Sequence, residues 1–147
     1  MKNIKYLLLI MTIVFASTSC DTYEDYDSDR IPVVGFTTKN RNINGIAEGT
    51  IRSTTVDVFA SDISSEDRTF EIIEVPIDNT TEYPPTEGDY SFDTTVTIPA
   101  GERVGTITLT GDNTNGKITT TRTYFRLAVK NDDTAASGGV VNVGLRR

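Results

Sequence analysis

Short runs of alternating apolar and polar residues follow one another from Ile31 to the end of the chain, and Gly, Asn, Asp or Pro breaks each run. This pattern is typical of β-strands with one buried face. No stretch of ten or more residues has the apolar spacing of an amphipathic helix. We therefore expect an all-β domain. The predicted strands are residues 32–38, 54–60, 69–77, 94–98, 104–110, 121–130 and 140–145, and residues 89–92 follow a loop at 78–88.

The alternation also predicts which side chains point inward. One face of residues 54–60 and one face of residues 121–130 carry the apolar side chains that we expect in the core. They are Val56, Val58, Ala60, Phe125, Leu127 and Val129. Residues 94–98 and 104–110 flank a Pro-Ala-Gly turn and are predicted to be adjacent strands. Seven or eight short strands of this kind indicate a sandwich of two sheets.

The composition narrows the chemistry that such a domain can perform. The 147 residues include no histidine and a single cysteine, and the formal net charge is −7. Catalysis by a Ser-His pair and zinc binding by Cys and His ligands are therefore excluded. A nucleic-acid partner is not expected, because binding to a phosphate backbone needs a basic surface. We expect one domain, residues 31–147, which is long enough to build its own core.

Residues 1–19 have the features of a targeting segment. Lys2 and Lys5 precede an apolar stretch of about eleven residues, which is too short for a membrane span of roughly 20. The segment ends at Cys20 and resembles a bacterial lipoprotein signal, in which that cysteine is acylated and becomes the new N-terminus. Ser17 stands where most such signals have an aliphatic residue, as in the relaxed signals of Bacteroidota lipoproteins. The alternative is an ordinary secretory signal that leaves Cys20 as an unpaired thiol.

Residues 20–30 consist of this cysteine and an acidic spacer. Five acidic residues follow Cys20 within nine positions, and such a run stays solvated and extended. The run is similar to the export signal that sends Bacteroidota lipoproteins to the outer leaflet of the outer membrane. We therefore expect an outer-membrane protein that is exposed on the cell surface and contacts the membrane through its N-terminal lipid.

Four short motifs of the domain occur in the order seen in one family. Ala-Glu-Gly at residues 47–49 precedes a V-x-V strand, and Gly-Asp-Tyr stands at residues 88–90. Val-Thr-Ile-Pro-Ala-Gly-Glu follows at residues 96–102 and Gly-Thr-Ile-Thr-Leu at residues 105–109. Together they resemble the Calx-beta domain, and small lipoprotein domains of Bacteroidota share the pattern. The resemblance covers about residues 33–145 and implies an immunoglobulin-like antiparallel β-sandwich of about seven or eight strands.

The resemblance also implies a possible calcium site, because the loops of animal Calx-beta domains bind calcium through clustered carboxylates. The matching positions are Glu48 and Asp89, with Asp112 in the next loop. Asp132 and Asp133 are further candidates if their loop folds to the same end. Calcium needs six to eight oxygen ligands, and the loop of Asp112 holds a single acid. We expect no cofactor, with calcium as the alternative, since these carboxylates can also hydrogen-bond turn amides.

An enzyme is not expected. Glycoside hydrolysis needs two carboxyl groups at a defined separation across a cleft, and nothing in the spacing of the acids places two together. These acids are Glu71, Glu74, Glu82, Glu87 and Glu102. Tyr83, Tyr90 and Tyr124 are candidates for stacking on a sugar ring, although tyrosines in sandwiches more often pack with a solvated hydroxyl.

The expected function is that of a lipid-anchored, extracytoplasmic, non-enzymatic binding or structural module whose partner is a protein or a glycan. One alternative is a surface glycan-binding lipoprotein that serves a polysaccharide uptake system. Another is a calcium-binding Calx-beta module. The fold alone does not decide among them.

Overall fold

The computed structural model describes residues 31–78, 81–84, 86 and 89–147. The predictions for the signal segment, Cys20 and the acidic spacer lie outside these residues. Within the described part of the chain no helix is long and apolar enough to cross a membrane. What the structure describes is the domain that begins at Ile31.

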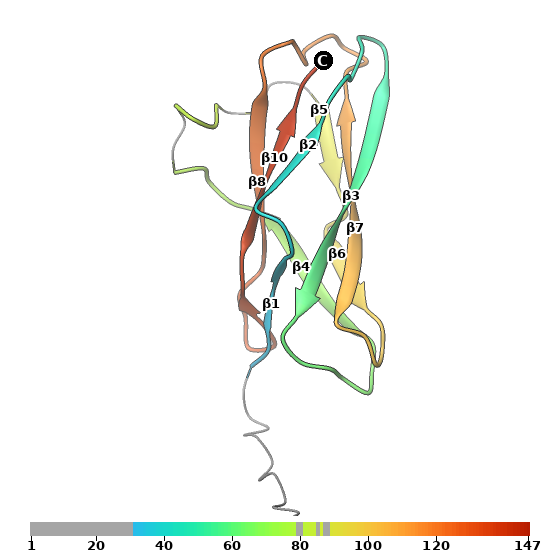
Figure 1. Ribbon diagram of the computed structural model, residues 1–147, viewed down its shortest axis with the longest axis vertical. Helices are drawn as coiled ribbons and strands as arrows, with labels where there is room; N and C mark the ends of the chain where they lie inside the picture. The colour runs from blue at the N-terminus through green and yellow to red at the C-terminus, as the bar shows by residue number, and fades with distance from the viewer. Residues whose placement is uncertain (1–30, 79–80, 85, 87–88) are drawn as a thin grey trace, which may run out of the picture. The chain divides into compact units, whose positions relative to one another are not determined.

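Ten strands form two five-stranded sheets, which confirms the all-β sandwich (Figure 1). Sheet I has the order β5 (Asp89–Phe92), β7 (Val104–Asp112), β3 (Ile51–Ala60), β1 (Val33–Phe36), β9 (Ala136–Ser137). Sheet II has the order β2 (Asn40–Ile43), β10 (Val140–Leu145), β8 (Thr123–Val129), β4 (Arg68–Glu74), β6 (Thr95–Ile98).

The core lies between the two sheets and is made of the side chains that the alternation predicts. Val56, Val58 and Ala60 of β3 are buried, as are Phe125 and Leu127 of β8. Each large apolar side chain that leaves water stabilises the fold by roughly 1.5–3 kcal/mol. Other members of this cluster are Val34, Phe36, Phe70, Ile72, Val96, Ile98, Ile107, Leu109, Val141, Val143 and Leu145.

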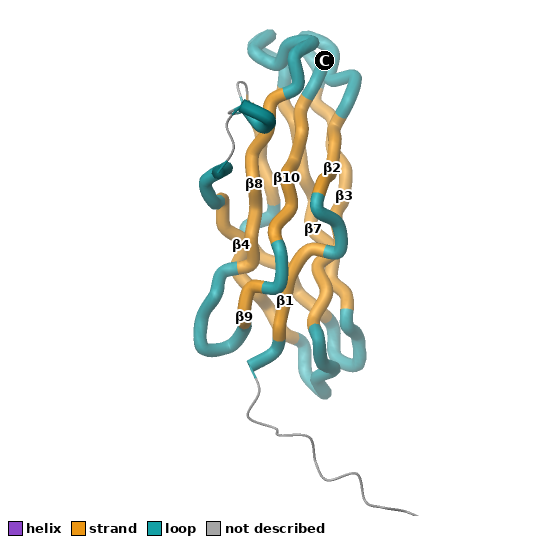
Figure 2. The backbone as a smooth tube through the Cα atoms, turned by 60° about the vertical axis from the view of Figure 1, so that its left-hand side comes forward, coloured by secondary structure: helices purple, strands orange, loops and turns teal. Residues whose placement is uncertain are grey.

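The sandwich is mainly antiparallel, as predicted, and two of its strand pairs are parallel. β1 pairs with β9 in sheet I and β2 pairs with β10 in sheet II (Figure 2). The parallel pairing arises because both chain segments cross from sheet I to sheet II in the same direction. The strands β2 and β9 were not predicted. β2 reads NRNI and has one apolar residue, and β9 spans only 2 residues, so neither shows alternation.

The two crossing segments approach each other closely at glycines. A Cβ atom on Gly35 would lie 2.7 Å from backbone atoms of Gly138 and Gly139, which is closer than real Cβ contacts come. Gly138 in turn faces the side chain of Val33. The side-by-side course of the crossings therefore depends on the missing side chain of Gly35.

The strands β6 and β7 are not paired, although their sequences predict adjacent strands. β6 pairs with β4, whereas β7 pairs with β3 and β5, so the turn between β6 and β7 connects the two sheets. An alternating pattern around a turn motif occurs where two consecutive strands pair in one sheet and also where they belong to different sheets. Gly105 lets the strands pack across the sandwich, because a Cβ there would lie 2.6 Å from the carbonyl oxygen of Thr97.

The strand β4 ends at Glu74, three residues before the predicted boundary, and its end opens one edge of the sandwich. The amide of Val75 still donates to the carbonyl of Arg126 at 2.9 Å, but Pro76 has no amide hydrogen to continue the ladder. The chain returns to β8 where the amide of Tyr124 donates to the carbonyl of Pro84 at 3.0 Å. Between these two bonds the chain leaves β8, and a pocket lies beside it.

Candidate functional site

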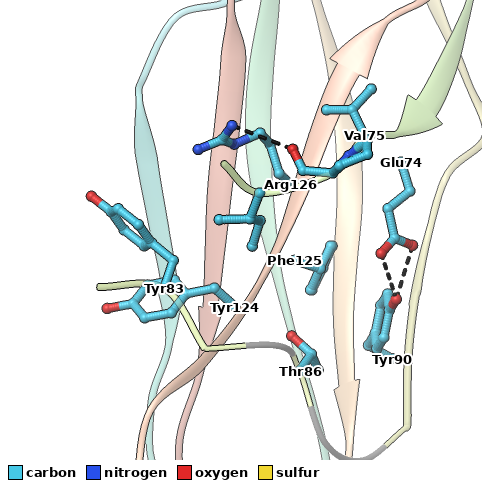
Figure 3. Close-up of a pocket in the computed structure, with 10 residues that line it drawn as sticks. Glu74, Val75, Tyr83, Thr86, Tyr90, Tyr124, Phe125 and Arg126 are labelled. Carbon is cyan, nitrogen blue, oxygen red and sulfur yellow. Dashed lines mark hydrogen bonds between the residues drawn. The ribbon is translucent and has the colours of Figure 1, made fainter. Parts of the chain in front are cut away.

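A pocket of about 230 Å³ lies at the edge where β4 leaves β8 (Figure 3). It draws on both sheets, because β4 and β8 belong to sheet II and β5 belongs to sheet I. We call it the tyrosine pocket. Its lining consists of Glu74, Val75, Pro76, Ile77, Tyr83, Thr86, Tyr90, Tyr124, Phe125 and Arg126.

Two pairs of aromatic rings form the walls of the tyrosine pocket. The ring of Tyr83 meets the ring of Tyr124 edge to face, with centroids 4.8 Å apart and planes at 82°. The ring of Tyr90 stacks on that of Phe125 with centroids 4.2 Å apart and planes at 20°. Tyr124 and Phe125 point to opposite faces of β8, as successive strand residues must. Because the pocket lies at the open edge of the sheet, side chains from both faces line it.

Glu74 and Tyr90 form the polar part of one wall. The Tyr90 hydroxyl donates to the carboxylate of Glu74 and lies 2.8 Å from Oε2 and 3.0 Å from Oε1. Burial, together with the hydrogen bond to Glu74 and its negative charge, raises the pKa of Tyr90 to about 12. The phenol therefore remains a neutral donor at physiological pH.

Arg126 ties the loop that leaves β4 to sheet II. Its Nε donates to Oδ1 of Asn142 at 2.8 Å, and Nη1 donates to Oδ2 of Asp78 at 3.1 Å and to the carbonyl of Pro76 at 3.4 Å. The Asn142 side chain is itself mostly buried, with a relative exposure of 9%. The bond to the carbonyl of Pro76, which Figure 3 draws, connects Arg126 to the loop beside the pocket.

Thr86 contributes a hydroxyl that no group among the described residues satisfies. Its Oγ1 is buried and has no hydrogen-bond partner in the structure. A buried polar atom without a partner costs free energy, and this one is shielded from solvent as the loop stands.

The structure brings together all three tyrosines that the sequence marks as candidates for stacking on a sugar. Glu74 was considered only as one of several scattered acids, and Phe125, Thr86 and Arg126 were not considered for a site. Pro76 was a usable signal for this edge of the sandwich, because proline within a strand pattern ends the ladder.

The calcium candidates are divided between the two ends of the sandwich. Glu48 and Asp112 lie in loops and strand ends at the end where the chain terminates, and Asp89 pairs opposite Asp112 in the register of β5 and β7. Asp132 and Asp133 follow β8 at the other end, so their loop does not fold to the same end. Within the described residues no group of three or more acidic, histidine or cysteine side chains is arranged to hold a metal ion.

The described carboxylates among these candidates make local contacts. Glu48 lies 3.5 Å from Nη1 of Arg147, and Asp89 accepts a hydrogen bond from Asn115. Hydrogen bonds from the side chain and amide of Thr114 lower the pKa of Asp112. Asp132 accepts hydrogen bonds from Thr134, which lower its pKa, and from the amide of Ala135. Asp112 and Asp132 therefore cap the turns that follow them, by accepting hydrogen bonds from turn amides.

The fold has matches among solved structures, whereas no family model and no curated protein matches the chain. A proposed carbohydrate-binding protein of Bacteroides ovatus ATCC 8483 is similar with a TM-score of 0.59 and 12% identity, over 78% of this chain and 37% of that one. CBD12 from CALX1.2 is similar with a TM-score of 0.53 and 12% identity, over 77% of this chain and 44% of that one. A multidomain protein of Bacteroides ovatus that includes DUF1735 has a TM-score of 0.54 at 18% identity, over 75% of this chain and 44% of that one.

The chain thus spans less than half the length of each of these structures. At such low identities the likeness establishes the fold alone, and the fold is Calx-beta-like, as the sequence motifs imply. What each neighbour binds is a property of that neighbour.

Proposed function

We propose that this protein is a lipid-anchored, extracytoplasmic, non-enzymatic module that binds a saccharide, with one sugar ring in the tyrosine pocket. The observation that carries the proposal is the convergence of Tyr83, Tyr90 and Tyr124 from three separate segments on one concavity. A binding role needs such a concave site with apolar walls and a few convergent polar groups.

The chemistry of the walls suits a sugar ring. The apolar face of a pyranose can lie on an aromatic ring, and its hydroxyls need donors and acceptors at the edges. Tyr83 and Tyr124 offer aromatic surface, and Glu74 offers acceptor oxygens. The volume of about 230 Å³ is below the roughly 300 Å³ at which pockets for drug-sized ligands begin, so a single ring is the unit that fits.

A binding role is favoured over hydrolysis by the number of carboxylates. Glu74 is the single carboxylate among the described residues that line the pocket, whereas glycoside hydrolysis uses a pair. Glu71 lies on the same strand but forms an ion pair with Lys130 at 2.6 Å, and Glu102 lies in the turn before β7. The carbohydrate-binding description of one structural neighbour agrees in kind with this proposal.

The proposed location rests on the sequence of the N-terminal segment. Acylation of Cys20 would tether the domain through the acidic spacer, which joins it at Ile31. A saccharide on the cell surface or in the periplasm is then within reach of the module. Service to a polysaccharide uptake system is the process that we propose for it.

A glycan array followed by calorimetry tests the binding function. The probe protein is the mature chain with Cys20→Ala, which keeps residues 21–147 and removes the acylation site. We expect a saccharide hit whose affinity falls at least about tenfold in Tyr124→Ala, as for truncation of a central aromatic contact.

The matched control is Phe59→Ala, because Phe59 is a partly exposed aromatic residue on β3 that does not line the pocket. This variant should keep the affinity. A blank array, or a hit that Tyr83→Ala and Tyr124→Ala both leave unchanged, would contradict the proposal. Circular dichroism of each variant confirms that it is folded.

A further inference from the structure

We infer that the tyrosine pocket accepts neutral and amino sugars and rejects acidic ones, because Glu74 places an uncompensated negative charge in its wall. This inference rests on the proposed function and specifies the class of saccharide. It follows from three observations: the balance of charges at the pocket, the contacts of Glu74, and the contacts of Arg126.

Three charged side chains decide the balance. Arg126 lines the pocket and is paired with Asp78, with 3.1 Å between Nη1 and Oδ2. Glu74 takes part in none of the ion pairs among the described residues. Among the described residues at the pocket, these two carboxylates and one guanidinium sum to one net negative charge. The whole chain, at −7, has the same sign.

The contacts of Glu74 leave it able to accept but not to donate. Its carboxylate already receives the single proton of the Tyr90 hydroxyl, which holds it in place beside the aromatic wall. An ionised carboxylate has about four acceptor positions, so further bonds from sugar hydroxyls or an ammonium group are available. A ligand carboxylate bound against this wall would instead meet the like charge of the exposed Glu74 at short range.

Arg126 does not reverse this preference. Arginine recognises carboxylates best through two parallel hydrogen bonds, which leave from Nε and one terminal nitrogen or from both terminal nitrogens. Nε is engaged by Asn142 and Nη1 by Asp78 and Pro76. Either two-bond arrangement would therefore have to break a bond that holds the pocket together.

The test compares sugars that share one ring and differ in a single charged substituent. The probes are the methyl glycosides of glucose, glucuronic acid and glucosamine, and the same set for galactose, each titrated calorimetrically into the Cys20→Ala chain at pH 7. We expect the uronic acid of the set that binds to be at least about tenfold weaker than the neutral sugar, and the amino sugar to bind at least as tightly as the neutral one.

Two substitutions separate charge from shape. Glu74→Gln keeps an acceptor for Tyr90 but removes the charge, and it should bring the neutral-to-acidic ratio toward one. Glu71→Gln removes the same charge from the same strand outside the pocket and should leave the ratio unchanged. If the wild-type protein binds a uronic acid as well as its neutral partner, the inference is overturned and the proposed function stands. If no glycoside of either set binds, the proposed function fails and the inference fails with it.

Discussion

The ring of Tyr90 in sheet I stacks on the ring of Phe125 in sheet II, with their centroids 4.2 Å apart. Phe125 is a core residue with 2% exposure, whereas Tyr90 lines the pocket. One wall of the pocket is thus continuous with the hydrophobic core. A ligand that binds against this wall meets side chains that are already ordered, which reduces the entropy lost on binding.

The hydrogen bond between Tyr90 and Glu74 predicts a loss of stability at alkaline pH. The pKa of Tyr90 is about 12 in the folded protein and 10.0 without the fold, so the unfolded chain loses this proton first. The contribution is complete below pH 10 and declines as the pH rises toward 12. Urea unfolding of wild type and Tyr90→Phe between pH 8 and 12 should show a difference in free energy that shrinks above pH 10. A difference that stays constant over this range would contradict the assignment.

Asn113 predicts a large effect on stability. It is fully buried, donates from Nδ2 to the carbonyls of Ile46 and Ile118, and accepts from the amide of Ile118. Asn113→Ala leaves these backbone groups buried without partners, so we expect the free energy of unfolding to fall by roughly 2–4 kcal/mol. The exposed Asn115 in the same loop is the control, and its alanine variant should lose about 1 kcal/mol or less. Equal losses in chemical denaturation would argue against this role.

The close approach of the crossing segments predicts that an added methyl group is not tolerated at Gly35. The Cβ of Gly35→Ala would lie 2.7 Å from backbone atoms, so we expect a loss of about 1–3 kcal/mol in thermal or urea unfolding. Gly139→Ala is the matched control, because its Cβ would come no closer than 3.8 Å to the carbonyl oxygen of Phe36. A Gly35→Ala variant as stable as this control would show that the segments can separate.

The arrangement of the acids predicts that calcium does not stabilise the domain. A site bound in the folded state raises stability by about 2.7 kcal/mol when the free ion is at 100 times its Kd. We expect thermal melts with millimolar calcium, millimolar magnesium and EDTA to superimpose. A rise in Tm that calcium alone produces, and that Asp112→Asn removes, would restore the calcium-binding alternative.

The lipoprotein assignment predicts that Cys20 carries a fatty acid. Cells grown with labelled palmitate should incorporate the label into the wild-type protein and not into Cys20→Ala. In cell fractionation, the wild-type protein should be in the membrane fraction and Cys20→Ala in the soluble fraction. A wild-type protein without label would indicate an ordinary secretory signal, and label that persists in the variant would show that Cys20 is not the acylated residue.

The sequence predicts the parts of the fold that depend on local alternation. The buried faces of β3 and β8 follow from period-two patterning because each strand has one face in the core. The pairing of β6 does not follow, since neighbours in sequence can pair or can connect two sheets. The opposite placement of Asp112 and Asp132 depends on the course of β8, which carries the chain from one end of the sandwich to the other.

The site was predictable as a set of residue types but not as a place. The stacking potential of Tyr83, Tyr90 and Tyr124 is visible in the sequence, whereas their convergence requires that β5 and β8 face each other across the sandwich. That contact links residues from different sheets, and no spacing in the sequence encodes it. Pro76 marks the end of the β4 ladder, but only the structure shows which strand edge it opens.

The position of β10 has a consequence for the order in which the chain folds. β10 lies between β8 and β2, and its Asn142 pairs with Asn40, 102 positions earlier. Sheet II therefore cannot be completed until Val140–Leu145 have been synthesised and have left the ribosome. Contacts so far apart in sequence form slowly, so the closure of sheet II through β10 is expected to be a late step in folding.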